Sequence, residues 1–218
     1  MIAAARIVKI FPNDLSEKRM DDVVHLLRRG GVIAYPTETV YGIGGDAADE
    51  TVLERIRRMK ERDVHHPFLI LVARSDDVFA YAKRVSSDAR MLMERFWPGP
   101  LTLVFDALPG LPKSLTAESD KIGIRVSPDP ICAALMDRYQ GALVSTSANR
   151  AGETPARSSL EVMHNFGEEL DLILDGGARE SGIPSTVLDV SEDSPRLIRE
   201  GAIGRAEIES IVGDVHGE

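Results

Sequence analysis

The chain has 218 residues, a length that fits one large domain and excludes a multidomain array. With 43% hydrophobic and 28% charged residues, it has the composition of a globular protein, which excludes intrinsic disorder and collagen-like structure. The 26 Lys and Arg against 35 Asp and Glu give a net charge of -9, so the chain as a whole would repel a polyanion, and a histone-like binder is excluded.

Short β-branched runs alternate with helical patterns along the chain. A strand over residues 5–11 precedes a helix that Ser16 could cap and Gly30 could end. A buried strand over residues 31–35 stops at Pro36, and after a loop of about a dozen residues a helix runs from 49 or 50 to 60. Further strands are predicted at 68–72, 101–106, 122–126, 142–145, 170–174, 186–190 and 196–198. Further helices are predicted at 75–82, 86–96, 128–139, 158–166 and 205–212.

This alternation favours an α/β fold in which helices cover the faces of a sheet. Several short connections near the C-terminus suit antiparallel neighbours. No repeat or linker-like tract divides the chain. We therefore predict a single domain over residues 1–218, built on a twisted open mixed sheet.

Three loops at predicted strand ends are rich in small hydroxyl, Gly and amide residues. They are residues 36–42 (PTETVYG), 145–149 (STSAN) and 183–186 (IPST). Any one of them could simply cap a helix or form a turn. Open α/β sheets bind their ligands at strand ends, so the recurrence of the pattern favours a small-ligand site built from all three loops.

Several cations are candidates for binding an anion. Residues 55–62 carry five positive charges at the end of a predicted helix, where cations also complement the helix dipole. If the chain becomes extended there, Lys60 and Arg62 would point to the same side and meet one anion. Arg125 and Arg199 lie at strand ends, where an Arg forms either a clamp on a carboxylate or phosphate or a surface ion pair.

Other familiar signals are absent or weak. There is no phosphate-binding P-loop, and residues 42–47 (GIGGDA) match a dinucleotide fingerprint only formally, because a loop separates them from the preceding strand. His65 and His66 lack the Cys or spaced His partners of a zinc site, so no protein-bound metal is expected. No Gly-x-Ser-x-Gly elbow occurs, and Cys132 lies within a predicted helix without an obvious base, which disfavours covalent hydrolase chemistry.

The sequence also indicates a compartment. The lone cysteine, Cys132, cannot form an internal disulfide, which favours a reducing environment. Charges at Arg6 and Lys9 interrupt any signal-peptide apolar region, and no stretch of about 18 uncharged apolar residues occurs. We expect a cytoplasmic protein that is neither exported nor inserted in a membrane.

Seven motifs taken together resemble one family. They are residues 36–42, Lys60-x-Arg62, residues 97–102 (WPGPLT), 123–125 (GIR), 145–149, 184–187 (PSTV) and 199–201 (REG). Their order and spacing over residues 15–212 resemble the YrdC/Sua5 family, the L-threonylcarbamoyladenylate synthases. Because the chain ends soon after the last motif, it resembles the short, single-domain members.

The resemblance implies a YrdC-like fold with a concave, positively lined cavity. It implies a nucleotidyltransferase that joins L-threonine, bicarbonate and ATP into threonylcarbamoyl-AMP and releases pyrophosphate, with Mg²⁺ accompanying the ATP. The product would serve N6-threonylcarbamoyladenosine modification of tRNA. Candidate further partners are tRNA or double-stranded RNA and tRNA-modification proteins.

The resemblance also assigns expected roles to residues of this chain. Around the threonine it places Arg125, which would hold the carboxylate, with Thr37, Thr39, Tyr41, Ser147 and Ser185. Around the ATP it places Lys60, Arg62, His66, Asn149, Arg157 and Arg199. The catalytic contribution is expected from Lys60, Arg62, Ser147 and Asn149. The chain departs from the family at His66, where an Asn is common, and Arg157 falls where members vary between Thr and Arg.

Two other functions remain open. The basic residues 55–62 could belong to a non-enzymatic module that binds tRNA or double-stranded RNA through phosphates. A YciO-like paralogue with a different substrate would share much of the motif set, but it would differ at the Lys-x-Arg motif, so Lys60 and Arg62 favour the synthase. Threonine differs from serine by one methyl group, which an apolar contact discriminates by only about 1 to 3 kcal/mol, so we expect incomplete preference over serine.

Overall fold

The computed structural model describes residues 5–13, 15–61, 63, 66–117 and 119–217. Its strands are β1 (Arg6–Lys9), β2 (Ile33–Pro36), β3 (Tyr41–Gly44), β4 (Leu69–Leu71), β5 (Leu101–Asp106), β6 (Lys121–Arg125), β7 (Leu143–Ser147), β8 (Leu172–Asp175), β9 (Thr186–Asp189), β10 (Arg196–Arg199) and β11 (His216–Gly217). Its helices are α1 (Glu17–Arg28), α2 (Glu50–Met59), α3 (Ser87–Phe96), α4 (Lys113–Thr116), α5 (Pro130–Tyr139), α6 (Ser159–Phe166), α7 (Arg205–Val212) and the 3-10 helix η1 (Ser75–Ala80).

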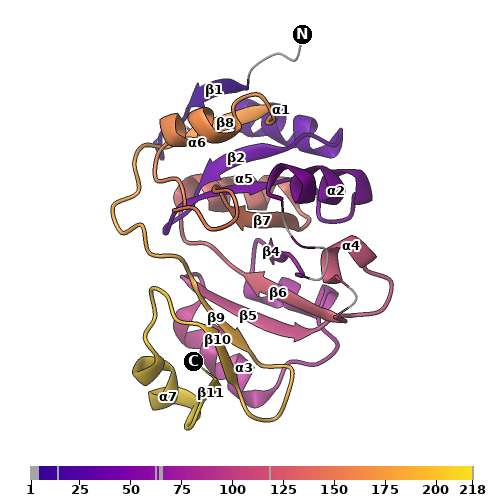
Figure 1. Ribbon diagram of the computed structural model, residues 1–218, viewed down its shortest axis with the longest axis vertical. Coiled ribbons are helices and arrows are strands. Elements are labelled where there is room, and N and C mark those ends of the chain that lie inside the picture. Colours follow the sequence, from indigo (N-terminus) through magenta and orange to yellow (C-terminus); the bar gives the residue numbers. More distant parts are fainter. Residues whose placement is uncertain (1–4, 14, 62, 64–65, 118, 218) are drawn as a thin grey trace.

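The described strands form one mixed sheet in the order β1-β8-β2-β3-β7-β4-β6-β5-β9-β10-β11. It runs from the top to the bottom of the molecule in Figure 1. Strands β1, β8 and β2 are parallel, β2, β3, β7 and β4 are successively antiparallel, and β5 pairs in parallel with β9. This arrangement confirms the prediction of an open mixed sheet.

Local sequence signals set the helix ends. Asp49 caps α2 by accepting hydrogen bonds from the backbone N–H groups of Thr51 and Val52. Asp129 caps α5 in the same way, and Pro130 occupies the first turn, where its missing N–H has no cost. Gly30 has a φ of 81°, a conformation that ends α1 with little strain. These ends match the sequence predictions closely.

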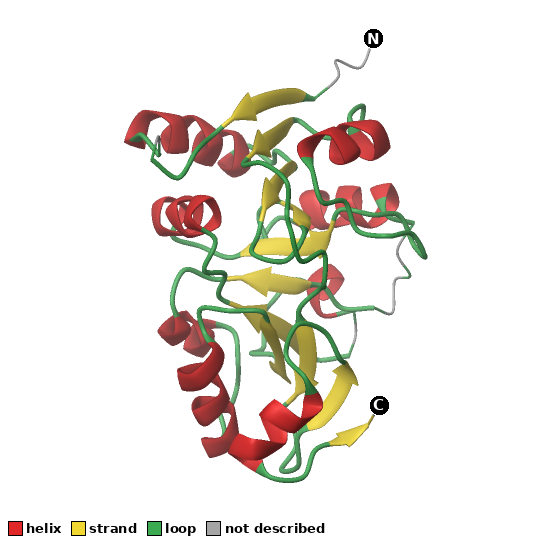
Figure 2. Ribbon diagram, turned by 90° about the vertical axis from the view of Figure 1, so that its left-hand side faces the viewer, coloured by secondary structure: helices red, strands yellow, loops and turns green. Residues whose placement is uncertain are grey.

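Two apolar clusters form the core on either side of the sheet. The smaller joins buried residues of α1 and α5 to β2 and β8. The larger joins residues of α2, α3, α6 and α7 to the remaining sheet surface. Figure 2 shows helices on both sides of the sheet in its upper half. The expectation that helices cover both faces is therefore confirmed there.

The main difference from the sequence prediction is β3. We predicted a loop between β2 and α2, and the structure instead forms a hairpin in which β3 pairs with both β2 and β7. Two of its four residues are glycines, which have low strand propensity, so the local signal was weak. A Cβ on Gly44 would lie 2.0 Å from the carbonyl oxygen of Val144, so close pairing with β7 requires glycine. Since Gly42 and Gly44 lie within this strand, a dinucleotide-binding turn is excluded.

Smaller differences occur elsewhere. Residues 75–80 form a 3-10 helix where we predicted an α-helix, and the short elements α4 and β11 were not predicted. Within the described ranges, no helix has both the length and the apolar character needed to cross a membrane.

Candidate functional site

The three hydroxyl-rich loops meet at one cavity of about 560 Å³, a volume typical of small-molecule sites. Strand pairing explains the meeting. Gly42 of β3 pairs with Ser147 at the end of β7, and Ser145 pairs with Leu69 of β4. Thr102 of β5 pairs with Val187, two residues after Ser185. The loops therefore converge because their strands are close in the sheet, although they are far apart in the chain.

Most of the residues expected around threonine and ATP line this cavity. They are Thr37, Thr39, Tyr41, His66, Arg125, Ser147, Asn149, Ser185 and Arg199. The lining also contains Lys121 and Arg196 as cations, against the carboxylates of Glu153 and Asp189. The described lining thus has an excess of positive charge.

Hydrogen bonds between hydroxyl groups of the lining fix the positions of these groups. The Oγ1 atoms of Thr37 and Thr39 lie 3.0 Å apart, and Thr37 Oγ1 also donates to the carbonyl of Val40 at 2.7 Å. Thr102 Oγ1 on β5 lies 3.0 Å from the Oγ atom of Ser185, the residue immediately before the neighbouring strand β9. Such pre-oriented hydroxyls can hold the polar groups of a small ligand without further rearrangement.

Arg125 is the most buried cation of the lining. Its side chain is 6% exposed, and Nη1 donates to Glu38 Oε1 at 2.9 Å and to Thr39 Oγ1 at 3.4 Å. Its Nε atom is buried and has no hydrogen-bond partner. Such buried donors without a partner are rare, and among the described residues the other one is Arg179 Nε. Because Arg125 lines the cavity and Arg179 does not, a ligand bound in the cavity could complete the hydrogen bonding of Arg125.

Arg199 enters the cavity from the end of β10. Its Nη2 donates to the carbonyl of Ser185 at 2.8 Å, which ties the strand end to the loop before β9. Burial, and secondarily the positive charge of Arg125, lower the pKa of Arg199. Because the two guanidinium groups influence each other across the cavity, an anion between them would relieve their repulsion.

Lys60 ends α2 beside this cavity. Its Nζ donates to the carbonyl oxygen of Ser147, so the ammonium group lies at the end of β7, although Lys60 is not among the residues lining the cavity. The backbone is not extended at Glu61, where φ is 50°, and residues 62, 64 and 65 lie outside the described part of the chain, so the expected extended segment is not tested there. Arg62 lies outside the described residues.

Arg157 is placed elsewhere. Its Nε donates to the carbonyl of Arg179 at 3.0 Å and its Nη2 to the carbonyl of Glu180 at 2.7 Å. It is not among the described residues that line the cavity. The structure therefore does not bring Arg157 together with the other cations expected to meet ATP.

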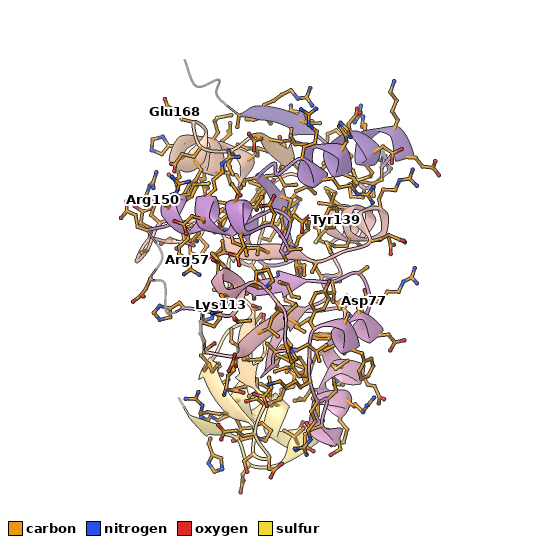
Figure 3. All side chains as sticks on the ribbon, turned by 90° about the vertical axis from the view of Figure 1, so that its right-hand side faces the viewer. Arg57, Asp77, Lys113, Tyr139, Arg150 and Glu168 are labelled. Atoms are coloured by element: carbon orange, nitrogen blue, oxygen red, sulfur yellow. The ribbon has the colours of Figure 1, made fainter. Side chains whose placement is uncertain are left out.

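The basic residues 55–62 do not form one cationic surface in their described part. Arg55 pairs with Asp171 at 2.7 Å, whereas Arg57 is buried over the ring of Phe68 and donates to the carbonyl of Ser114. In Figure 3, Arg57 accordingly lies near Lys113 of α4. These side chains turn in different directions, which argues against a phosphate-binding surface on this helix.

Sequence reasoning missed several cavity residues. Lys121, Gly123 and Arg125 alternate along β6 and all line the cavity, so the period of two in a strand was a signal that could have found Lys121. Lys121 pairs with Asp189 at 2.8 Å. Glu38, which accepts a hydrogen bond from Arg125, and Ser127, which donates to Glu38, gave no comparable signal. In the part of the chain that the structure describes, no three His, Cys, Asp or Glu side chains are grouped so as to hold a metal ion.

The chain resembles known proteins over most of its length. The family model Sua5/yciO/yrdC, described as "Telomere recombination", matches residues 25–201. Threonylcarbamoyl-AMP synthase of Klebsiella pneumoniae is 35% identical over 191 residues, which cover 87% of this chain and 99% of that protein. The protein of the same name from Pyrococcus abyssi is 35% identical over 189 residues, but this chain spans only 56% of its length.

Solved structures show the same similarity. P. abyssi Sua5 complexed with L-threonine superposes with a TM-score of 0.93 at 32% identity, covering 98% of this chain and 63% of that one. E. coli YciO superposes with a TM-score of 0.86 at 29% identity, covering 94% and 99%. The family model, the relatives and the superposed structures agree, and the chain belongs to the Sua5/YciO/YrdC family.

Proposed function

We propose that this chain forms threonylcarbamoyl-AMP from L-threonine, bicarbonate and ATP, with release of pyrophosphate. The observation that carries the proposal is the convergence of Arg125, Arg199 and three hydroxyl-rich loops on one cavity. Relatives named threonylcarbamoyl-AMP synthase, at 35% identity, support it. The reaction requires an anchor for a carboxylate and cations for a triphosphate within one cavity, and the presence of Arg125 and Arg199 in the lining supports this requirement.

For threonine, Arg125 is the proposed carboxylate anchor. Its unpartnered Nε is positioned to complete a bidentate contact of the kind that guanidinium groups make with carboxylates. Thr37, Thr39, Tyr41, Ser147 and Ser185 would surround the rest of the amino acid. The structure of P. abyssi Sua5 with L-threonine makes this substrate a natural first choice.

For ATP, Arg199 and Lys60 are the proposed phosphate partners, with Asn149 and His66 on the nucleotide side. Arg62 remains a proposed partner from the sequence motif. Arg157 would need to leave the carbonyl groups of Arg179 and Glu180 to reach a phosphate, so its role as an ATP contact has no support from the geometry.

The proposed chemistry has two steps. The amine of threonine attacks the carbon of bicarbonate, and loss of water leaves a carbamate. A carbamate oxygen then attacks the α-phosphorus of ATP, the bond to the β-phosphate oxygen breaks, and pyrophosphate leaves with the negative charge. No covalent enzyme nucleophile takes part. The chain contributes by holding the reactants together, while Lys60 and Arg199 stabilise charge on the phosphates.

The proposal also covers the metal ion, the use of the product and the location of the protein. We propose that Mg²⁺ enters as the counter-ion of ATP, and that the product passes to a tRNA-modifying step that involves other proteins. A cytoplasmic location is supported by the single free cysteine, Cys132, which is buried.

A pyrophosphate-release assay tests the function. Purified protein given L-threonine, bicarbonate and Mg-ATP should release pyrophosphate, and omission of any one substrate should abolish the release. Threonine-independent release would contradict the proposal. Mass spectrometry of the product would identify threonylcarbamoyl-AMP directly.

A YciO-like paralogue with another substrate is the second candidate, favoured by the similarity to E. coli YciO. Calorimetric titration with L-threonine and with other amino acids separates the two. Binding of ATP without binding of L-threonine would favour the paralogue. Tight, steeply salt-dependent binding of RNA without either small ligand would favour the RNA-binding module.

A further inference from the structure

Glu38 stands between two threonines that line the cavity, but it is not itself among the described lining residues. Both of its carboxylate oxygens are used by the protein. Oε1 accepts from Arg125 Nη1 at 2.9 Å, and Oε2 accepts from Ser127 Oγ at 2.5 Å. The side chain of Glu38 is 16% exposed, so this ion pair is well shielded from water.

The way in which Glu38 binds Arg125 leaves one edge of the guanidinium group available. Glu38 and Thr39 both accept from Nη1, whereas Nε is buried without a partner and no hydrogen bond in the described chain uses Nη2. Nε and Nη2 together form the edge on which a guanidinium binds a carboxylate through two parallel hydrogen bonds. Glu38 therefore occupies the end of Arg125 that a bidentate ligand would leave unused.

Glu38 is in turn fixed by the start of α5. Ser127 Oγ, which donates to Glu38, also accepts from the backbone N–H of Asp129 at 3.2 Å. Asp129 caps α5 and pairs with Arg179 at 2.7 Å. The carboxylate of Glu38 is thus tied to the start of α5 as well as to its own loop between β2 and β3.

We propose that Glu38 is a positioning residue for recognition of the amino-acid substrate. It holds Arg125 at Nη1 so that the Nε–Nη2 edge receives the α-carboxylate. This inference rests on the proposed function, since it takes L-threonine as the ligand. A carboxylate that competed with the substrate for Arg125 would have the opposite role. The two roles predict changes of opposite sign when Glu38 is removed.

The test is calorimetric titration of L-threonine into the wild type, Glu38→Ala, Glu38→Gln and Glu169→Ala. Positioning predicts that Glu38→Ala raises the Kd for L-threonine about tenfold, the loss expected for one charge-assisted hydrogen bond. Glu38→Gln should recover much of this loss, because its amide oxygen can still accept from Arg125. Glu169→Ala is the matched control, since it removes the partner of Arg150 at 2.7 Å outside the cavity lining, and it should leave the Kd unchanged.

Kinetics and a double-mutant cycle separate positioning from a general structural role. Glu38→Ala should raise the KM for threonine and leave the KM for ATP unchanged, with kcat at saturating threonine near that of the wild type. In an Arg125→Ala background, Glu38→Ala should have no additional effect on threonine binding. An equal effect in both backgrounds would overturn the proposal.

Each other outcome of the titrations either supports or overturns the positioning role of Glu38. Unchanged or tighter threonine binding by a folded Glu38→Ala would overturn positioning and favour competition. Should Glu38→Ala fail to fold, Ser127→Ala decides, because it keeps the ion pair and removes the group that fixes Glu38; about threefold weaker binding supports the proposal and unchanged binding overturns it. Failure of the wild type to bind L-threonine would overturn both this inference and the proposed function, whereas binding that is insensitive to Glu38 would overturn only the inference.

Discussion

Arg125 and Arg199 line the same cavity, and the positive charge of Arg125 adds to burial in lowering the pKa of Arg199. An anion bound between the two guanidinium groups would offset this repulsion. Arg125 already has the carboxylate of Glu38 as a partner, whereas Arg199 Nη2 donates to the neutral carbonyl of Ser185. Of the two guanidinium groups, Arg199 is therefore the one whose charge an anionic ligand would neutralise.

We expect substitution of Arg125 to affect the use of threonine and substitution of Arg199 to affect the use of ATP. Arg125→Ala should mainly raise the KM for threonine, because it removes the carboxylate anchor. Arg199→Ala should mainly lower kcat/KM for ATP, by about 2 to 4 kcal/mol in transition-state stabilisation. Steady-state pyrophosphate release with each substrate varied in turn measures both effects. Arg58→Ala, which removes an exposed partner of Glu54, is the control, and equal effects of all three changes would refute the assignment.

Lys60→Ala should lower ATP-dependent turnover. The ammonium group donates to the carbonyl of Ser147, at the point where β7 meets the cavity, so its loss removes a cation near the proposed phosphates. We expect a loss of about 2 to 4 kcal/mol in kcat/KM for ATP with little change in the KM for threonine. Lys113→Ala on α4 serves as a control for the loss of one positive charge. Wild-type kinetics for Lys60→Ala would remove it from the site.

Arg179→Ala should destabilise the protein and disturb the cavity. Arg179 donates to Asp129 Oδ2 at 2.7 Å and to the carbonyl of Thr37 at 3.3 Å, and its guanidinium lies 5.9 Å from the centre of the Tyr41 ring. Its removal leaves a buried carboxylate without its ion-pair partner, so we expect the free energy of unfolding to fall by about 2 to 4 kcal/mol. Urea denaturation measures this. A loss below about 0.5 kcal/mol would show that this network contributes little to the fold.

Cys132 should be unreactive in the folded protein. Burial raises the pKa of its thiol from an ordinary 9.0 to about 12, so almost no thiolate is present at pH 8. A chromogenic disulfide reagent should react with it only after unfolding in urea. Because the unfolded chain loses this proton near pH 9 and the folded chain does not until about pH 12, the thiol's contribution to stability should decrease as the pH rises through that interval. Rapid labelling of the native protein at pH 8 would contradict the prediction.

Much of the fold was predictable because its signals are local. The strand at Leu101–Asp106 and the helix at Arg205–Val212 have the bounds that the sequence predicts. Asp49 and Gly30 mark helix ends through their own hydrogen-bonding and backbone preferences. The strand β3 was missed for the same reason, since a glycine-rich tetrapeptide becomes a strand only when two neighbouring strands pair with it.

The candidate site was predicted in outline. The hydroxyl-rich loops and the two strand-end arginines could be identified from the sequence, and the structure places them around one cavity. The environment of each cation could not be predicted from the sequence. Arg157 is bound by carbonyl groups of residues 179 and 180, and Arg57 is buried over Phe68, although both have the same charge as Arg125.

The sequence by itself thus determined the order of elements, the mixed α/β sheet and the segments that carry polar function, because periodicity, caps and turn residues act over a few neighbouring positions. The tertiary structure alone decided which cations face the cavity and which carboxylate orients Arg125. Glu38 and Arg125 are 87 positions apart in the chain, and their 2.9 Å contact arises only when the sheet brings the loop between β2 and β3 close to the end of β6. Ion pairs act over a few ångströms in space, so no local pattern in the sequence encodes them.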